Sequence, residues 1–119
     1  MSRRDPWAFQ RWAFEVRTGN PTRKAVLVSL AVMADTNTGR CEAEQATIAQ
    51  QIENGERTVR RALADLEAAI LIARRHQYRR DGARRCDEFL LLAPWVSEWP
   101  DGEALPARAA GGRRSTTGQ

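Results

Sequence analysis

The chain has 119 residues, which is enough for one folded domain with short extensions. Its hydrophobic share of 42% and charged share of 29% are ordinary for a globular protein whose core folds without a disulfide or a metal. No stretch approaches the roughly 20 apolar residues of a membrane span, and no apolar segment follows the charged N-terminus. We therefore expect a cytoplasmic protein without a signal peptide.

The net charge of +4 is unevenly distributed along the chain. Residues 56–85 contain nine arginines and four acidic residues, a surplus of +5, which leaves −1 for the rest of the chain. A basic cluster on an otherwise near-neutral chain is typical of proteins that bind a polyanion.

The first predicted element is an amphipathic helix that starts with Asp5 as N-cap and Pro6 in the first helical position. Its apolar stripe recurs at helical spacing and consists of Phe9, Trp12, Ala13 and Val16. A break at residues 18–21 ends this helix. We assign residues 1–20 to this N-terminal helix and its linker.

A second helix is predicted from Thr22, as N-cap, to about Asp35. Its main apolar face consists of Val26, Leu27, Leu30, Met33 and Ala34. Val28 and Val32 lie on the opposite side, and a helix that is apolar nearly all round is usually buried. We expect this helix to form the centre of the core.

A turn at residues 36–39 leads to a very short strand at residues 40–41. A helix of about two turns follows from Gln45 to Ile52, where apolar residues again recur at helical spacing. The Asn54-Gly55 pair then predicts a tight turn.

The next helix is predicted over residues 56–69, with an apolar face and a basic face. The apolar face consists of Val59, Leu63, Leu66 and Ile70, and the basic face begins with Arg57, Arg60 and Arg61 and ends with Ala64 and Ala68. Long donors at the start of an exposed helix reach guanine edges or phosphates in a major groove, and small residues behind them avoid its walls.

A hairpin follows, with strands at residues 73–78 and 89–92 and a tip at residues 79–83, where Asp-Gly is the turn signal. Four arginines bracket the tip: Arg79, Arg80, Arg84 and Arg85. Such a concentration of like charge indicates an anionic partner, because phosphates relieve the repulsion. Residues 94–100 form a short aromatic segment with one expected helical turn at 95–99, and residues 101–119 are expected to be a disordered tail.

This order predicts a mainly α fold with a small β-hairpin. Three runs carry a resemblance to bacterial and phage winged helix-turn-helix proteins: Val26-Leu27-Val28-Ser29-Leu30-Ala31, Gln45-Ala46-Thr47-Ile48-Ala49 and Glu56-Arg57-Thr58-Val59-Arg60-Arg61. The resemblance covers about Thr22 to Leu92 and implies a three-helix core with a wing over residues 21–93. It also implies DNA contacts at Arg57, Thr58, Arg60 and Arg61, with the wing at 79–85.

The chain departs from that family pattern at three places. Glu53-Asn54-Gly55 replaces the usual Gly-hydrophobe-Ser turn, although Asn54 is still suited to cap the next helix. Ile70 stands where a glycine normally ends the recognition helix, and a left-handed backbone is costly for isoleucine. Glu44 stands where a small polar residue usually caps the preceding helix.

The function expected from these features is binding of double-stranded DNA, as a transcriptional regulator associated with the nucleoid. Two alternatives remain open: a protein–protein adaptor that uses its arginines against an acidic partner, and a replication accessory of a plasmid or phage. With one histidine, His76, and no metal-ligand spacing, phosphate loop or paired carboxylates, we expect no enzymatic activity, cofactor, metal or small-molecule substrate.

The four tryptophans all lie outside residues 21–92: Trp7, Trp12, Trp95 and Trp99. We expect the two terminal segments to pack together as a small satellite core, with a homodimer interface built from the same side chains as the alternative. Cys41 and Cys86 are expected to be small buried thiols, with a redox-sensing pair as the alternative. His76 is expected to be a surface or packing residue.

Overall fold

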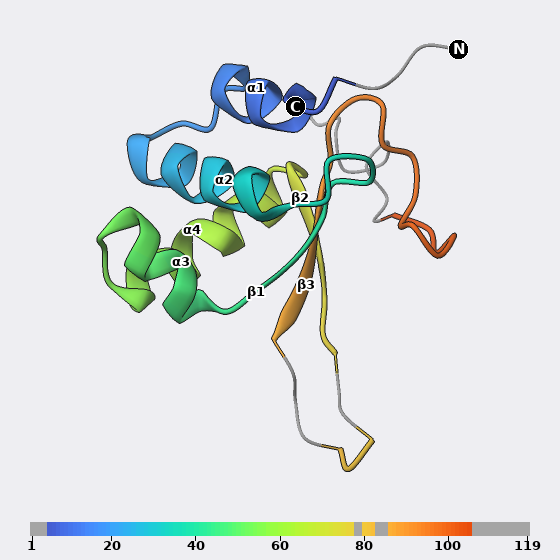
Figure 1. The fold of residues 1–119 in the computed structure, drawn as a ribbon. Helices are drawn as coiled ribbons and strands as arrows, with labels where there is room; N and C mark the ends of the chain where they lie inside the picture. The colour runs from blue at the N-terminus through green and yellow to red at the C-terminus, as the bar shows by residue number, and fades with distance from the viewer. Residues whose placement is uncertain (1–4, 78–79, 83–85, 106–119) are drawn as a thin grey trace, which may run out of the picture.

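The computed structural model describes residues 5–77, 80–82 and 86–105 (Figure 1). Within these ranges the elements are α1 (Ala8–Glu15), α2 (Pro21–Met33), β1 (Arg40–Ala43), α3 (Gln45–Ile52), α4 (Glu56–Ala68), β2 (Ile72–Arg75) and β3 (Asp87–Leu91). The helices gather on one side of a small antiparallel sheet, and the hairpin that contains β2 and β3 extends from the body at the end opposite α1 (Figure 1). No helix in these ranges is long and apolar enough to cross a membrane.

The sheet has three strands in the order β1-β3-β2: the expected hairpin is joined by the short strand expected at residues 40–41, whose place in the sheet we had not predicted. β1 continues two residues beyond the expected strand and pairs with β3, with Cys41 opposite Phe89. β2 pairs with the other edge of β3, with Arg74 opposite Phe89. β3 is therefore the central strand, and all five of its residues are buried. Residues 78–79 and 83–85 of the expected hairpin lie outside the described residues.

Helix α2 forms the centre of the helical layer, as we expected, and contacts α1, α3 and α4. The side chains of Val26, Leu27 and Leu30 are fully buried. The expectation that α2 is covered on all sides is wrong, because Val32 is 59% exposed and Val28 is only half-buried. The neighbouring helices leave one side of α2 open.

The cap of α2 is Asn20 and not Thr22. The Asn20 side-chain oxygen accepts a hydrogen bond from the Arg23 N–H at 2.8 Å, and Pro21 occupies the first helical position. Asparagine is among the best capping residues, and proline loses no hydrogen bond at that position. At α1, the expected N-cap Asp5 is wrong: Trp7 occupies the N-cap position and regular helix begins at Ala8, two residues later than predicted, while the Asp5 carboxylate accepts a hydrogen bond from the Trp7 N–H at 2.9 Å.

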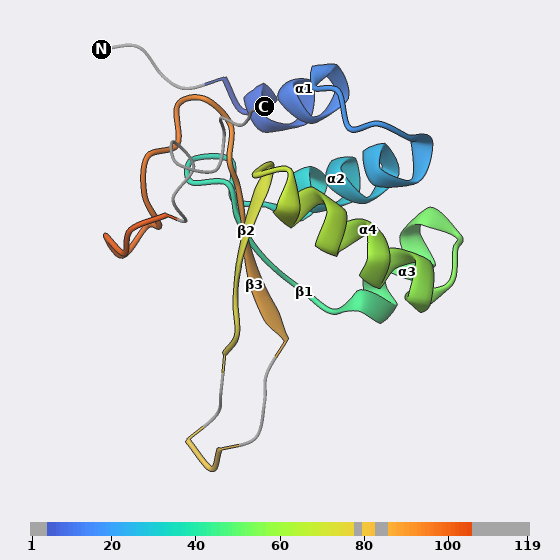
Figure 2. The ribbon, with the colours of Figure 1, turned by 180° about the vertical axis from the view of Figure 1, so that it is seen from behind.

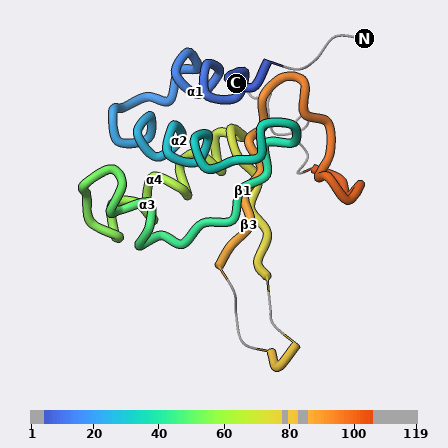
Figure 3. Tube along the Cα trace, viewed as in Figure 1, coloured from blue at the N-terminus to red at the C-terminus, as the bar shows by residue number. Residues whose placement is uncertain are grey.

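Helices α3 and α4 begin and end within one residue of the predicted bounds, and a short turn joins them (Figure 3). The cap expected from Asn54 is wrong, because Gly55 occupies the N-cap position without a side-chain hydrogen bond and Asn54 accepts only from the Gly55 N–H, at 2.9 Å. A left-handed residue follows each helix: Glu53, with φ 58°, comes directly after α3, and Ile70, with φ 59°, comes two residues after α4. Ile70 thus takes the backbone that glycine usually supplies, and its half-buried side chain packs against the core.

The segment after β3 folds back on itself and makes no regular helical turn, which corrects our expectation for residues 95–99. A turn at residues 94–95 leads to a bridge between Glu98 and Ala104, and the Trp99 N–H donates to the Glu103 carbonyl at 3.0 Å. Residues 101–105 therefore belong to the described fold, further along the chain than we placed the start of the tail. Residues 106–119 lie outside the described residues.

The exposed left-handed residue Glu53 provides a test of the α3–α4 turn. We expect Glu53→Gly to raise the free energy of unfolding by about 1 kcal/mol, because glycine adopts this backbone without the penalty that a Cβ atom brings. Glu53→Ala is the matched control, since it removes the charge and keeps the Cβ atom. Denaturant unfolding measures both variants, and equal stability of the two would contradict the left-handed geometry at this position.

Candidate nucleic-acid interface

The outer face of α4 carries the arginines that the sequence analysis selected. Val59, Ala62, Leu63 and Leu66 turn inward and are buried, which leaves the opposite face of the helix in solvent. Four candidate residues on that face are exposed: Arg57, Thr58, Arg60 and Arg61. Among the described residues, none of these arginines forms an ion pair. Three guanidinium groups therefore lie free on two turns of one helix.

Two acids of α4, Asp65 and Glu67, pair with arginines of other elements, whereas Glu56, next to Arg57 and one turn before Arg60, is exposed. Asp65 stands one turn after Arg61 on α4, but its carboxylate accepts from the Nε of Arg23 on α2 at 3.1 Å. Glu67 lies 3.6 Å from the Nε of Arg74 on β2. Asp65 and Glu67 therefore bind arginines of α2 and β2 and not those of α4 itself, and the outer face of α4 keeps a net positive charge.

The arginines of β2 are neutralised, in contrast to those of α4. Arg75 donates two hydrogen bonds to Glu88, both at 3.0 Å, and its guanidinium also reaches Asp101 and Glu103 at 3.0 and 2.6 Å. The same group lies over the ring of Trp99, 3.9 Å from its centroid. Arg75 therefore ties β2 to β3 and to the segment after β3, and is not available to an external anion.

Arg74, on the other face of the sheet, is also enclosed. It lies 3.5 Å from the carboxylate of Asp87 and 5.4 Å above the ring centroid of Phe89, and its side chain is 16% exposed. Its Nε is buried without a hydrogen bond. Two of the nine arginines counted in residues 56–85 are therefore structural. The sequence analysis missed this role of Asp87 and Glu88, although Glu88 stands opposite Arg75, and Asp87 lies two residues from Phe89, the partner of Arg74, once the strands of the hairpin are paired.

Glu88 connects all three strands, because it also accepts a hydrogen bond from Arg40 on β1. The residue is only 5% exposed. Burial alone would raise the pKa of this carboxyl, but hydrogen bonds and charge from Arg75 and Arg40 outweigh burial and lower its pKa. At neutral pH the carboxylate is therefore charged, and both of its oxygens accept hydrogen bonds from arginines of the neighbouring strands.

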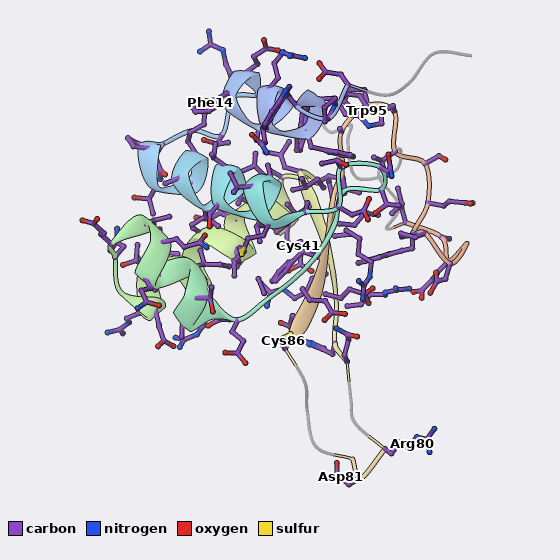
Figure 4. All side chains as sticks on the ribbon, in the orientation of Figure 1. Phe14, Cys41, Arg80, Asp81, Cys86 and Trp95 are labelled. Atoms are coloured by element: carbon purple, nitrogen blue, oxygen red, sulfur yellow. The ribbon has the colours of Figure 1, made fainter. Side chains whose placement is uncertain are left out.

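The hairpin places one described arginine far from the body of the protein. Arg80 is exposed at its tip, next to Asp81 (Figure 4). The other three candidates in the hairpin, Arg79, Arg84 and Arg85, lie outside the described residues. The hairpin leaves the body at the end where α3 lies, and α4 occupies the near side of the body in the reverse view (Figure 2).

The approach to α4 also has an acidic border. Glu44, Glu56 and Asp87 line a small hollow together with Cys86 and Phe89, between the start of α4 and the sheet. Carboxylates repel phosphates, so an anion that approaches α4 is directed towards its arginines and away from this hollow. The described residues contain no group of three or more His, Cys, Asp or Glu side chains placed to hold a metal ion.

The tryptophans occupy different environments. Trp99 is 2% exposed beneath Arg75 and has no surface to offer a partner, which removes it from the candidate dimer interface. Trp12 packs against the core, whereas Trp7 and Trp95 are 59% and 40% exposed. The rings of Phe9 and Trp95 are 5.2 Å apart, so the two terminal segments meet, as expected.

The two cysteines do not form a redox pair in this arrangement. Cys41 stands opposite Phe89, so Cys86 lies three residues further along, about 10 Å away at the usual strand rise. A disulfide requires Cα atoms within about 7 Å. Burial, with a smaller contribution from a negative charge on Cys86, raises the pKa of Cys41 to about 11, which keeps its thiol protonated and unreactive at neutral pH. Cys41 is buried as expected, and Cys86 is half-buried.

The chain matches none of the protein-family models, curated proteins or solved structures with which it was compared. Its function is therefore inferred from its own residues. The geometry brings together Arg57, Thr58, Arg60 and Arg61, and it separates them from the neutralised arginines of the sheet.

The carboxylate of Glu88 gives a pH-dependent test of the sheet. We expect Glu88→Gln to lower the free energy of unfolding at pH 7 by about 2 kcal/mol, because two arginines lose their buried counter-charge. The pKa of Glu88 is lower in the folded protein than its ordinary value of 4.5, so its contribution is complete above that value and is lost as the pH falls through the folded pKa.

The difference between wild type and Glu88→Gln should therefore shrink as acid is added. Urea unfolding at a series of pH values from 7 to 3 measures it. Glu98→Gln is the control, because Glu98 is exposed and makes no ion pair within the described residues. A difference that stays constant down to pH 3 would contradict the assigned role of Glu88.

Proposed function

We propose that this protein binds double-stranded DNA through a winged helix-turn-helix, with α4 as the recognition helix and the hairpin of β2 and β3 as the wing. The observation that carries the proposal is the set of three arginines on the outer face of α4 that form no ion pair with any described residue, beside a sheet whose own arginines are neutralised. A protein that can pair its arginines internally and leaves these three in solvent has a surface suited to an external polyanion.

The arrangement of elements supports the same proposal. Two helices, α3 and α4, are joined by a short turn and pack on α2, and a β-hairpin follows α4 in the chain. In the helix-turn-helix mode the second helix lies in the major groove and its N-terminal residues reach base edges. The arginines of α4 stand in its first two turns, where such contacts are made.

Each candidate side chain has a distinct role in this proposal. Arg57 and Arg60 are suited to guanine O6 and N7 or to phosphates, and Thr58 to a phosphate or a thymine methyl. Arg61 lies beside the N-terminus of α2, in a shallow hollow shared with Asn20 and Thr58, and is best placed for the backbone. Arg80 extends from the hairpin tip towards flanking phosphates. The biological setting that fits best is transcriptional regulation, and a replication accessory would use the same DNA chemistry.

We expect Arg60→Ala to weaken binding to a mixed pool of genomic duplexes by about 1–3 kcal/mol, because a long cationic donor is lost from the groove face. Fluorescence anisotropy at fixed salt measures the change. Arg17→Ala is the matched control, because Arg17 is exposed and forms no ion pair within the described ranges, but belongs to the linker between α1 and α2. Equal affinities of wild type, Arg60→Ala and Arg61→Ala would exclude α4 as the binding element.

The salt dependence of binding provides a second test. If about six phosphates are neutralised, the logarithm of the binding constant should fall with the logarithm of the salt concentration with a slope near −5. Loss of Arg61, which we assign to the backbone, should reduce that slope by about one. A protein–protein adaptor would show no binding to duplex DNA at moderate salt, and that result would refute the proposed function.

A further inference from the structure

The first residue of α4 is an acid that stands among the exposed arginines. Glu56 is itself exposed and forms no hydrogen bond or ion pair with any described residue. Arg57 follows it directly, and Arg60 lies four residues later, about 40° further around the helix at 100° per residue. The surface assigned to DNA therefore presents a carboxylate as well as three guanidinium groups.

Glu56 stays unpaired, within the described residues, although its position in the helix favours a partner. A glutamate four residues before an arginine is the favourable order for an ion pair along a helix. Asp65 and Glu67 each contact an arginine of another element, whereas Glu56 and Arg60 both remain in solvent. Both side chains of this potential pair thus keep their hydrogen-bonding capacity for an external molecule.

The helix dipole gives Glu56 a structural role as well. A carboxylate in the first turn of a helix is stabilising, and Glu56 is the acid of that turn in α4. This effect needs a negative charge, but it needs neither the length of glutamate nor two oxygens without partners. A substitution that keeps the charge and shortens the side chain therefore separates the structural role from a binding role.

The outer face of α4 has two edges that look towards different elements. Glu56 lines a small hollow together with Asp87, on the side of the helix next to the sheet. Arg61 and Thr58 line a different hollow, beside the N-terminus of α2. If the second edge takes phosphates, as proposed above, the first residue of α4 is left to face base edges, which the N-terminal residues of a recognition helix contact.

A duplex offers a carboxylate few groups to bind. Phosphates are anions, and guanine O6 and N7 and thymine O4 are acceptors, so all of them repel it. Among the base edges of the major groove, only the amino groups of cytosine and adenine donate hydrogen bonds. Adenine presents the acceptor N7 beside its amino group, whereas cytosine presents no acceptor there. Cytosine N4 is therefore the group on a duplex that matches a carboxylate best.

We propose that Glu56 is a specificity-determining residue that accepts a hydrogen bond from the N4 amino group of a cytosine in the major groove. This role rests on the proposed function, because it exists only if α4 binds DNA. The guanine paired with that cytosine presents O6 and N7 on the same base pair, and the adjacent Arg57 is suited to them. The preferred duplex thus has a C·G pair where the start of α4 lies.

The carboxylate of Glu56 selects mainly by excluding other duplexes. Phosphate contacts made by the arginines carry no sequence information, so they attract every duplex alike. Glu56 adds repulsion from phosphates and base acceptors to each of these complexes, and only a donor at the right base pair offsets it. An unfavourable contact with the wrong partners is a common source of discrimination. Glu56 therefore converts a general attraction into selection.

Selection of bound duplexes from a random pool by the full chain identifies the base pair that Glu56 reads. We expect wild type to enrich a motif with one C·G pair for which Glu56→Gln loses the preference. The glutamine variant should favour adenine at that position, because its amide matches adenine N6 and N7. Glu67→Gln is the matched control and should keep the wild-type motif, since Glu67 is an exposed acid on the same side of α4, about three turns further along.

Removal of the amino group alone provides a second measurement. The selected cytosine is replaced by 2-pyrimidinone, which lacks N4, and fluorescence anisotropy at fixed salt gives the affinities. Wild type should lose about tenfold more affinity than Glu56→Asp, which keeps the charge at the helix start but not the reach. The comparison of the two proteins cancels the effect of the analogue on the duplex itself. Equal circular dichroism spectra show that the variants are folded alike.

An unchanged motif in Glu56→Gln, or equal losses of wild type and Glu56→Asp on the analogue, would overturn the role of Glu56. Wild type that binds all duplexes alike would also refute this role, and it would leave DNA binding by α4 in place. Absence of binding to any duplex at moderate salt would instead refute the proposed function, and the role of Glu56 with it.

Discussion

Glu88 stands on the central strand between Arg40 of β1 and Arg75 of β2, and its buried carboxylate holds both guanidinium groups. A buried carboxylate is tolerated only when its charge and lone pairs are satisfied, so this contact fixes how the three strands pair. Arg75 extends the network to Asp101 and Glu103, which brings the segment after β3 onto the sheet. Because the same contact engages Arg40 and Arg75, these two arginines are not available to other molecules.

The distribution of charge follows from this network. Asp87 and Glu88 neutralise the arginines of β2, and Arg23 takes Asp65 away from the arginines of α4. Within the part of the chain that the structure describes, the arginines left without an ion pair are those on the outer face of α4, Arg80 at the hairpin tip and Arg17 in the linker. Helix α2 lies between this basic face and an apolar hollow lined by Phe14, Val28, Val32 and Ile52, so one helix that is open on its hollow side separates two surfaces of different chemistry.

The sequence predicted the elements whose signal is local. Helices α3 and α4 were placed within one residue because their apolar positions recur without a gap and Asn54-Gly55 marks the turn between them. The start of α2 was misplaced because Asn20-Pro21 resembles a break as much as a cap followed by a first helical residue. The exposed basic residues of α4 were predicted correctly, since helical periodicity alone determines which side of an amphipathic helix is covered.

Features that depend on long-range contacts were not predictable in the same way. The pairing of β1 with β3 joins residues almost fifty positions apart, and it made the sheet three-stranded. The neutralisation of Arg75 required the register of the hairpin, which places it opposite Glu88. The exposure of Val32 depends on how far α1 and α3 cover α2, and no periodicity encodes that. The left-handed backbone of Ile70 was unexpected because isoleucine, with its branched Cβ atom, usually avoids a positive φ.

The central claim is that the free arginines of α4, and not the paired arginines of the sheet, contact DNA. NMR spectra of the arginine side-chain Nε–H groups, recorded while a duplex is added, test it most directly because each arginine gives its own signal. The account predicts that the signals of Arg57, Arg60 and Arg61 shift progressively, while those of Arg40 and Arg75 stay in place. Unchanged signals from α4, or shifts confined to the sheet arginines, would contradict it.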